Sequence, residues 1–224
     1  MSRNTTLISP FTIPAEVSVK GFSARSFVDT KNNFFRLKRV LDLIISCAFI
    51  LFVLSWLIPL MAILIPAESK GPLFFRQRRV GRGGKSFWCL KFRTMYVNRD
   101  SNTRQAERND RRITRIGRIL RETNIDEFPQ FINVLRGEMS VIGPRPHMYA
   151  DCNRFSQVVN GYKFRNLVKP GITGLAQVKG YHGPAVTYKS IFRRFQWDAF
   201  YVRNASLRLD FRILRRTISQ RLLS

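Results

Sequence analysis

Acidic residues and histidines are scarce in this chain. Its 224 residues include 14 Asp and Glu, 39 Lys and Arg and two histidines, and the formal net charge is +25. With only His147 and His182 available, a histidine-rich metal site or a Ser-His-Asp triad is disfavoured. So large a positive charge instead indicates a partner that is nucleic acid, anionic lipid or a phosphorylated substrate.

Cysteine is also sparse. Cys47, Cys89 and Cys152 are odd in number and widely spaced, so they provide neither a disulfide framework nor the spacing of a metal site. We expect thiols that are buried or face a membrane, in a reducing compartment. Residues 1–33 lack the apolar stretch of a signal peptide, and we expect them to form a mobile tail.

One long apolar run is present. No residue from Leu43 to Ala67 is charged, and the run exceeds the ~18 residues that indicate a membrane helix. Basic residues flank both ends, and Pro59 follows Ser55, whose hydroxyl can bond a carbonyl that the proline frees. Two basic ends and a central break favour a re-entrant helix over residues 34–70. A kinked helix that spans the bilayer remains the alternative.

After Gly71-Pro72 the pattern changes to short strands and helices, which we assign to a domain over residues 71–224. Strands are expected at Leu73 to Phe75 and Phe87 to Phe92, joined by a glycine-rich segment at residues 81–84. That segment is either a hairpin turn or a phosphate-binding loop. A helix with outward-facing arginines is expected from Ile113 to Arg121.

Two adjacent carboxylates, Asp126 and Glu127, stand out in so basic a chain. Pro129 is tolerated only in the first turn of a helix, which places a helix start near Asp126, and Gly137 is expected to end that helix. The positive end of the helix would stabilise both ionised carboxylates. Neighbouring helical residues point about 100° apart, so one of the two carboxylates can contact a substrate while the other binds a metal ion. The alternative is that the two carboxylates only mark the start of a helix, where acidic residues are common.

The last part of the chain, residues 188–223, mixes aromatic residues with arginines. Aromatics on one face and arginines elsewhere suit a helix that lies in a membrane interface. A surface helix packed on the domain is the alternative.

Several motifs occur in an order that resembles the bacterial sugar transferase family, the small monotopic phosphoglycosyl transferases that act on polyprenol phosphate. The resemblance covers most of the chain, from about Phe35 to Ile218. The motifs are Lys38-Arg39 with Asp42, Gly71-Pro72-Leu73-Phe74-Phe75-Arg76-Gln77, Lys91-Phe92-Arg93-Thr94-Met95, Thr114-Arg115-Ile116-Gly117-Arg118, Asp126-Glu127-Phe128-Pro129-Gln130, Gly137-Glu138-Met139-Ser140, Gly143-Pro144-Arg145-Pro146 and Lys169-Pro170-Gly171-Ile172-Thr173-Gly174-Leu175-Ala176-Gln177-Val178.

The resemblance implies an α+β, mainly helical fold. It would be a compact cytoplasmic α/β unit with an N-terminal re-entrant membrane helix and interfacial amphipathic helices, in the bacterial inner membrane. It also implies transfer of a hexose-1-phosphate from a UDP-sugar, with UDP-glucose preferred, to undecaprenyl phosphate with release of UMP. This would be the first step of exopolysaccharide, capsule or O-antigen repeat synthesis. Membrane lipid is an expected partner, nucleic acid is not, and an oligomer is left open.

The resemblance also assigns roles to particular residues. Asp126 would attack the β-phosphate and hold a covalent phosphosugar, and Glu127 would bind Mg²⁺, whose preferred ligands are oxygens. We expect phosphate contacts from the basic residues of the motifs. These are Lys91, Arg93, Arg118 and Arg145, and His182 stands where many relatives have an arginine.

Two other classes of protein are weighed against this one. A basic nucleic-acid-binding protein fits the charge, but no recognised binding motif is present and the uncharged run argues against it. A non-catalytic membrane scaffold fits the apolar run, but the adjacent Asp126 and Glu127 beside the basic motifs argue for an enzyme.

Overall fold

A computed structural model describes residues 31–98, 110–181, 183 and 187–222. Residues 33–224 form one compact unit, mostly helical with two small sheets, as the sequence predicts. The tail expected at residues 1–33 and the polar segment at 98–112 lie largely outside the described residues. The boundary that we placed at residue 70 stays a prediction.

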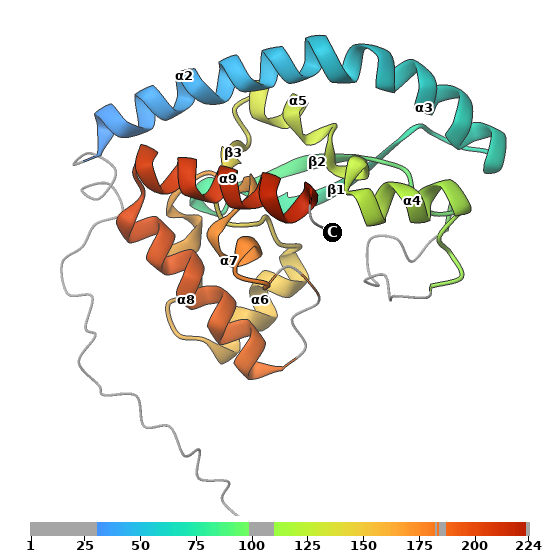
Figure 1. Cartoon of the computed structure of the whole chain (residues 1–224). Helices are drawn as coiled ribbons and strands as arrows, with labels where there is room; N and C mark the ends of the chain where they lie inside the picture. The colour runs from blue at the N-terminus through green and yellow to red at the C-terminus, as the bar shows by residue number, and fades with distance from the viewer. Residues whose placement is uncertain (1–30, 99–109, 182, 184–186, 223–224) are drawn as a thin grey trace, which may run out of the picture. The chain divides into compact units, whose positions relative to one another are not determined.

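The elements follow one another in an order that begins with helices, continues through a hairpin and ends with helices (Figure 1). The first half contains α2 (Asn32–Phe49), the π-helical turn η1 (Ile50–Leu54), α3 (Ser55–Glu68), β1 (Phe74–Val80), η2 (Arg82–Gly84), β2 (Ser86–Phe92), α4 (Arg115–Thr123) and η4 (Ile125–Glu127). The second half contains α5 (Gln130–Leu135), β3 (Ser140–Ile142), α6 (Tyr149–Val158), η5 (Tyr162–Leu167), β4 (Gly171–Thr173), α7 (Leu175–Val178), α8 (Tyr188–Asn204) and α9 (Leu207–Leu222).

The apolar run forms one helix, α2–η1–α3, that is long and apolar enough to cross a membrane. The break that we expected at Pro59 is wrong, because Pro59 lies inside regular α3. The distortion lies in the preceding turn, η1, where Ser55 N–H bonds to Ile50 O in place of Leu51 O. The Leu51 carbonyl accepts from Ser55 Oγ at 2.5 Å, so Ser55 bonds a carbonyl of the preceding turn and not the one that Pro59 frees.

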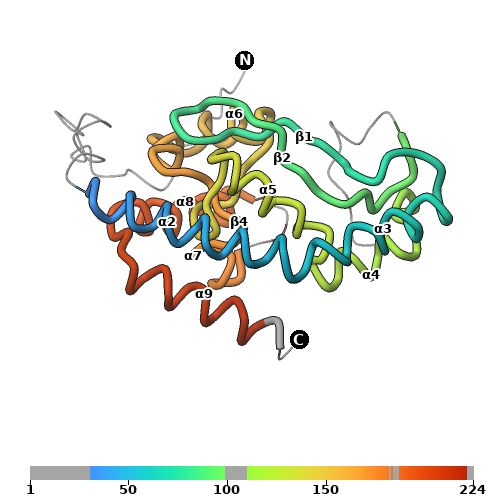
Figure 2. The backbone as a smooth tube through the Cα atoms, turned by 90° about the horizontal axis from the view of Figure 1, so that it is seen from above, coloured from blue at the N-terminus to red at the C-terminus, as the bar shows by residue number. Residues whose placement is uncertain are grey.

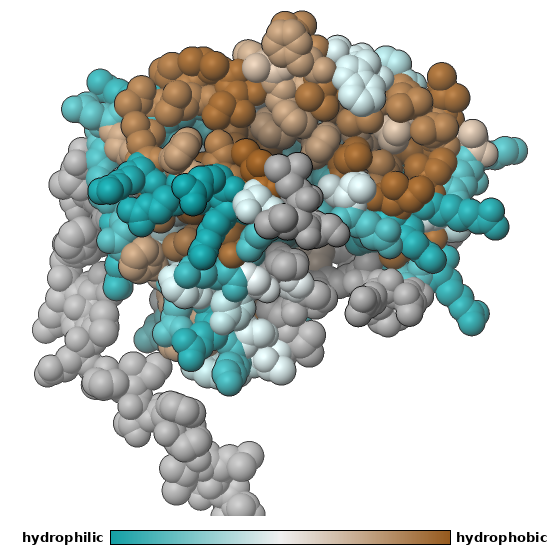
Figure 3. Space-filling model, in the orientation of Figure 1, coloured by the Kyte–Doolittle hydropathy of each residue, from teal (hydrophilic) through white to brown (hydrophobic). Residues whose placement is uncertain are grey.

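The outward face of this helix is strongly hydrophobic. Only 22% of its most apolar segment is buried, so it is not the core helix of a soluble domain. Figure 3 shows the apolar surface gathered mainly over α2 and α3, whereas the rest of the face in view is mostly polar with smaller apolar patches. Large exposed side chains on this face include Val40, Ile44, Leu51, Phe52, Trp56 and Ile63.

The first half of the helix is fastened to the unit by charged side chains. Arg39 donates to the carbonyls of Val134 (2.6 Å) and Leu135 (2.9 Å) at the C-terminal end of α5, where the Val134 carbonyl also accepts from Gly137 N–H at 2.9 Å. Lys38 forms a buried ion pair with Asp210 of α9 at 2.6 Å. Helix α9 therefore starts beside α2 and diverges from it toward its own C-terminus (Figure 2).

Buried and capping contacts hold the helix at two further points. Asp42 accepts from the backbone N–H of Val141 at 2.9 Å and from the hydroxyl of Ser140 at 3.1 Å. At the other end, Glu68 accepts from the first two backbone N–H groups of α4, at 2.5 and 2.9 Å. Carboxylate oxygens at a helix start satisfy N–H groups that have no helical partner. Both ends of the apolar helix are thus bonded to the same folded unit.

The expected hairpin is confirmed as the antiparallel pair β1–β2, with Phe75 opposite Lys91 and Arg79 opposite Phe87. The glycine-rich segment is its turn, with Gly81 N–H bonded to Lys85 O at 2.7 Å. Because side chains alternate between the faces of a strand, Gln77 and Arg79 share a face with Lys91. This face lines the cavity described below.

The parallel pair β3–β4 brings two glycine–proline loops together. A Cβ atom on Gly171 would overlap the backbone of Gly143, and one on Gly143 would overlap Lys169 O. Only glycine permits this close approach of two backbones. The loop that carries Arg145 is thereby fixed against the loop before β4.

The C-terminal stretch forms two helices. Helix α8 buries Ile191, Tyr201 and Val202, whereas α9 leaves Phe211 and Ile218 exposed. Helix α8 is therefore a helix packed on the domain, which was the alternative prediction. Helix α9 is amphipathic, as the prediction of a helix in the membrane interface requires. Free thiols behave as predicted, with Cys89 and Cys152 buried and Cys47 exposed on α2.

Replacing Asp42 by Ala is expected to lower the free energy of unfolding by about 1–3 kcal/mol, because the buried Val141 N–H loses its acceptor. Thermal or chemical unfolding of the purified protein in detergent measures the change. Arg36→Ala, at an exposed position of the same helix, is the matched control. Equal stability of Asp42→Ala and the wild type would contradict this account of how the helix is held.

Candidate active site

Asp126 and Glu127 lie in η4, a single turn between α4 and α5. This differs from the expected helix start, because α5 begins only at Gln130 with Pro129 as its N-cap. Asn124, with φ of 58°, directs the chain from α4 into this turn. Gly137, with φ of 80°, follows the end of α5 as predicted. Both carboxylates are buried.

Glu127 is held between two cations. Lys91 of β2 bonds its Oε1 at 2.6 Å, and Arg145 donates to Oε1 at 2.5 Å and to Oε2 at 3.0 Å. Burial alone would raise the pKa of Glu127, but Arg145 and Lys91 outweigh it and hold this pKa well below its usual range. Glu127 is therefore ionised and fixed in position.

Asp126 is in a different situation, since its nearest cation is Lys91 at 3.8 Å. Burial raises the pKa of Asp126, and Lys91 opposes this rise. The expectation that a helix end stabilises both ionised carboxylates is thus wrong for Asp126. Asp126 lines the cavity and Glu127 does not, so the adjacent carboxylates have separate environments.

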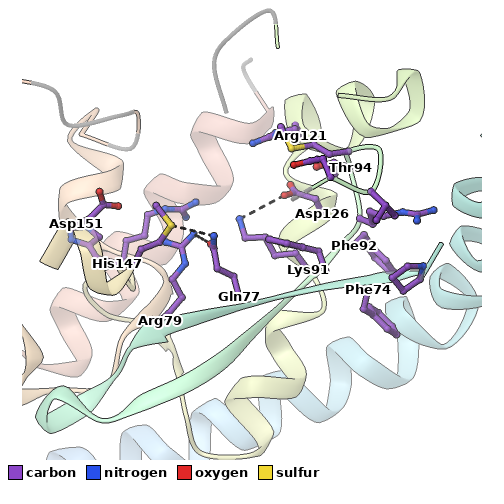
Figure 4. Close-up of a pocket in the computed structure, with 18 of the residues that line it drawn as sticks. Phe74, Gln77, Arg79, Lys91, Phe92, Thr94, Arg121, Asp126, His147 and Asp151 are labelled. Atoms are coloured by element: carbon purple, nitrogen blue, oxygen red, sulfur yellow. Dashed lines mark hydrogen bonds and ion pairs between the residues drawn. The ribbon is translucent and has the colours of Figure 1, made fainter. Parts of the chain in front are cut away.

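The cavity beside Asp126 has a volume of about 360 Å³ and two chemically different ends. Figure 4 shows Lys91 between Asp126 and a polar group, with Phe74 and Phe92 on the far side of Asp126. The polar end contains Gln77, Arg79, His147, Asp151 and Arg194, and the apolar end contains Pro72, Phe74, Phe92, Met95 and Val97. Such a cavity suits a ligand with both polar and apolar parts.

The structure brings together only part of the predicted set. Lys91 and Arg145 lie at the carboxylates, whereas Arg93 lines the cavity and donates to the carbonyls of Ser69 and Lys70. Arg118 is exposed on α4 and does not line the cavity. His182 lies outside the described residues.

Sequence reasoning missed Arg79, Arg121, His147 and Arg194. For Arg79 a signal was available, because alternation along β1 places it on the same face as Lys91 once the hairpin register is known. No such signal existed for Arg194, which reaches the cavity from α8 through tertiary packing.

A buried network supports Arg145 from behind. Arg165 donates to the Arg145 carbonyl at 2.6 Å and to Asp198 at 2.9 Å, and Arg165 and Asp198 are both 2% exposed. Burial opposes the charge of Arg165, but Asp198 raises its pKa. The backbone that carries Arg145 is therefore fixed by a paired charge.

The donor set fits a Mg²⁺ ion that is held mainly by substrate. Glu127 Oε2 accepts only from Arg145, which leaves one acceptor position free on an ionised carboxylate. Mg²⁺ commonly binds one or two carboxylates together with substrate phosphates and water. No group of three or more His, Cys, Asp or Glu that would suffice alone is present among the described residues.

Comparison with known proteins places this architecture in a family. The model of the bacterial sugar transferase family matches residues 32–224, and the chain belongs to this family. The match begins at the first residue of α2, so the apolar helix is part of the shared region. The sequence-based recognition of the family is confirmed.

Characterised relatives carry related names. A UDP-glucose:undecaprenyl-phosphate glucose-1-phosphate transferase of Klebsiella pneumoniae is 43% identical over 182 residues, which cover 81% of this chain and 39% of the relative. One of the same name from Caulobacter vibrioides is 44% identical, with 81% and 68% covered. The exopolysaccharide production protein PSS of Rhizobium leguminosarum bv. phaseoli is 41% identical, with 81% and 93% covered. The chain thus spans well under half of the Klebsiella relative.

Lys91→Met is expected to raise the pKa of Asp126 further, because Lys91 is the cation that most opposes the effect of burial. The carboxyl is ionised only above its pKa, so the pH at which Asp126 becomes a carboxylate moves upward. Carboxyl carbon NMR titration of aspartate-labelled protein measures the shift. Lys85→Met, at the exposed hairpin turn, is the control. An unchanged or lowered pKa in Lys91→Met would contradict this assignment.

Proposed function

We propose that the protein is a phosphoglycosyl transferase that moves a hexose-1-phosphate from a UDP-sugar, with UDP-glucose preferred, to undecaprenyl phosphate and releases UMP. The observation that carries the proposal is the split between the adjacent carboxylates. Asp126 faces the cavity, and Glu127 is held by Lys91 and Arg145. Attack on a phosphate requires an accessible carboxylate as the nucleophile and nearby positive charge that is held in place.

The reaction divides into two displacements at one phosphorus. In the first, an Asp126 oxygen bonds to the β-phosphorus, the bond to the bridging oxygen breaks, and UMP leaves with the electron pair. In the second, an oxygen of undecaprenyl phosphate bonds to the same phosphorus and the aspartyl oxygen leaves as carboxylate. The sum is UDP-sugar plus undecaprenyl phosphate giving undecaprenyl diphosphate-sugar plus UMP.

Each residue has a physical task in this scheme. Lys91 favours the ionised form of Asp126, and Arg145 keeps Glu127 ionised beside it. Mg²⁺ is proposed as the cofactor, and when bound at Glu127 with substrate phosphates it would neutralise phosphate charge. The apolar end of the cavity, near Phe74 and Phe92, is compatible with the first units of a polyprenyl chain.

The names of the relatives support the choice of donor and acceptor. Two of them are named as transferring glucose-1-phosphate from UDP-glucose to undecaprenyl phosphate, and the third is named for exopolysaccharide production. We therefore propose that this protein initiates repeat-unit synthesis of an exopolysaccharide, capsule or O-antigen.

The contacts of the apolar helix support a re-entrant topology. Arg39 and Asp42 bond the first half to the folded unit, and Glu68 bonds the other end to α4. A helix that crosses the bilayer delivers its ends to opposite sides, which is incompatible with bonding both to one domain. We propose that α2–η1–α3 enters and leaves on the cytoplasmic side of the inner membrane, with the catalytic residues facing the cytoplasm.

Cysteine labelling tests this topology. In a cysteine-free background, single cysteines at Arg36 and Lys70 are both expected to react with an impermeant maleimide in inside-out vesicles, and neither in intact spheroplasts. A cysteine at Phe52, 73% exposed on the apolar face, is the control and should react only after detergent is added. Labelling of the two flanks from opposite sides would establish a spanning helix instead.

Asp126→Asn is expected to abolish UMP release, by at least about 10³-fold, because an amide cannot form the aspartyl intermediate. UMP release from a panel of UDP-sugars with undecaprenyl phosphate and Mg²⁺ measures this, and intact mass reports the phosphosugar adduct. Glu122→Gln, at an exposed acidic position on α4, is the control. Full activity of Asp126→Asn would refute the assignment, and absence of wild-type activity with every sugar would favour a scaffold.

A further inference from the structure

Two arginines at the polar end of the cavity have no acidic partner among the described residues. Among the described residues, the side chain of Arg194, which is 8% exposed, donates only to the carbonyl of Gly183. Arg79 donates to the carbonyl of Pro146 at 2.8 Å and to the Gln77 side chain. The Nε–H groups of both arginines are buried and without a partner.

Positive charge in this position is unfavourable unless an anion binds it. Moving a guanidinium out of water costs several kcal/mol unless an opposite charge compensates. Two other arginines near the cavity are compensated by a carboxylate, Arg145 by Glu127 and Arg165 by Asp198, whereas Arg93 bonds only the carbonyls of Ser69 and Lys70 among the described residues. Burial lowers the pKa of Arg79 and of Arg194, which shows the same deficit of negative charge.

His147 adds a directed neutral donor to this end of the cavity. It is 4% exposed, and its Nδ1 lies 2.9 Å from the hydroxyl of Tyr162, which is 1% exposed. Burial and nearby arginines hold the pKa of His147 well below its usual range, so the ring is neutral. No other acceptor for the Tyr162 hydroxyl is found among the described residues, so we assign it as the donor to Nδ1, which places the ring proton on Nε2. This Nε2–H is buried and unpartnered.

We propose that Arg79, Arg194 and His147 form an anion site that binds the phosphate of the nucleoside monophosphate as it leaves. This deepens the proposed function and rests on it, because the donor's β-phosphate is taken to lie at Asp126. The site would offer N–H donors from three side chains that line the cavity, two of them charged, and such donors suit the oxygens of a phosphate.

The position of this site along the hairpin separates it from the reacting carboxylate. Arg79 lies on the same face of the hairpin as Lys91 and four residues from the position paired with it, roughly 13 Å along the strand. Figure 4 shows Lys91 between Asp126 and the Arg79–His147 group. We take a diphosphate bound at Asp126 to have its second phosphate beside Lys91, on the side toward Arg79 and His147, which also line the cavity. The site would stabilise the charge that develops on the departing UMP.

Binding of UMP to the purified protein in detergent tests the proposal without turnover. Arg194→Met and Arg79→Lys are each expected to weaken UMP binding by about 10- to 100-fold, as loss of a charge-assisted bond predicts. Affinity for glucose 1-phosphate, which would occupy the Asp126 end, should be unchanged. Uridine, which lacks phosphate, should bind equally to the wild type and the variants. Arg78→Met, on the opposite face of β1 and exposed, is the matched control.

Unliganded stability distinguishes a binding role from a structural one. Removing an uncompensated buried charge should leave the Tm of Arg194→Met equal to or above that of the wild type, with only the UMP-induced rise lost. A lowered unliganded Tm, unchanged UMP affinity in both variants, or no UMP binding by the wild type would each overturn the anion site. Absence of UMP release with intact, arginine-dependent UMP binding would refute the proposed reaction alone.

Discussion

The carboxylate of Glu127 between Lys91 and Arg145 is the interaction on which the site depends. It joins three segments that are distant in sequence, namely the turn η4, the hairpin and the loop after β3. Because Glu127 is buried and the side chains of Lys91 and Arg145 are only 19% and 28% exposed, loss of one group would leave poorly solvated, uncompensated charge. The same ion pairs fix the turn that presents Asp126 to the cavity, so the geometry of the reactive group follows from the electrostatics of its neighbour.

The basic residues of the chain occupy two kinds of position in the structure. Some arginines remain at the surface, but Arg93, Arg145, Arg165 and Arg194 enter the unit and bond backbone carbonyls or carboxylates there. Carbonyl acceptors satisfy hydrogen bonds without neutralising charge, so the interior retains positive potential. This potential is directed at the cavity, which is where a diphosphate substrate would be held.

Local rules predicted the features that depend on neighbouring residues. The hairpin, the turn at residues 81–84 and the helix end at Gly137 all follow from short-range geometry. Pro59 was misplaced as a break because a proline can lie inside a continuous helix, and the distortion occurs in the preceding turn, η1. The cavity members Arg194 and His147 were not predictable, since residues 147 and 194 meet only through the packing of α6, η5 and α8. The pKa of Asp126 likewise depends on burial, which no local pattern reveals.

The bonding of both ends of the apolar helix to one folded unit has a consequence for the membrane itself. A helix that is free at one end adapts to bilayers of different thickness by tilting. Here Arg39, Asp42 and Glu68 hold the helix at a fixed angle, and tilting would break their hydrogen bonds. In the re-entrant topology that we propose, the height of the cavity above the lipid headgroups would then be set by the protein alone and would stay the same in membranes of short or long acyl chains.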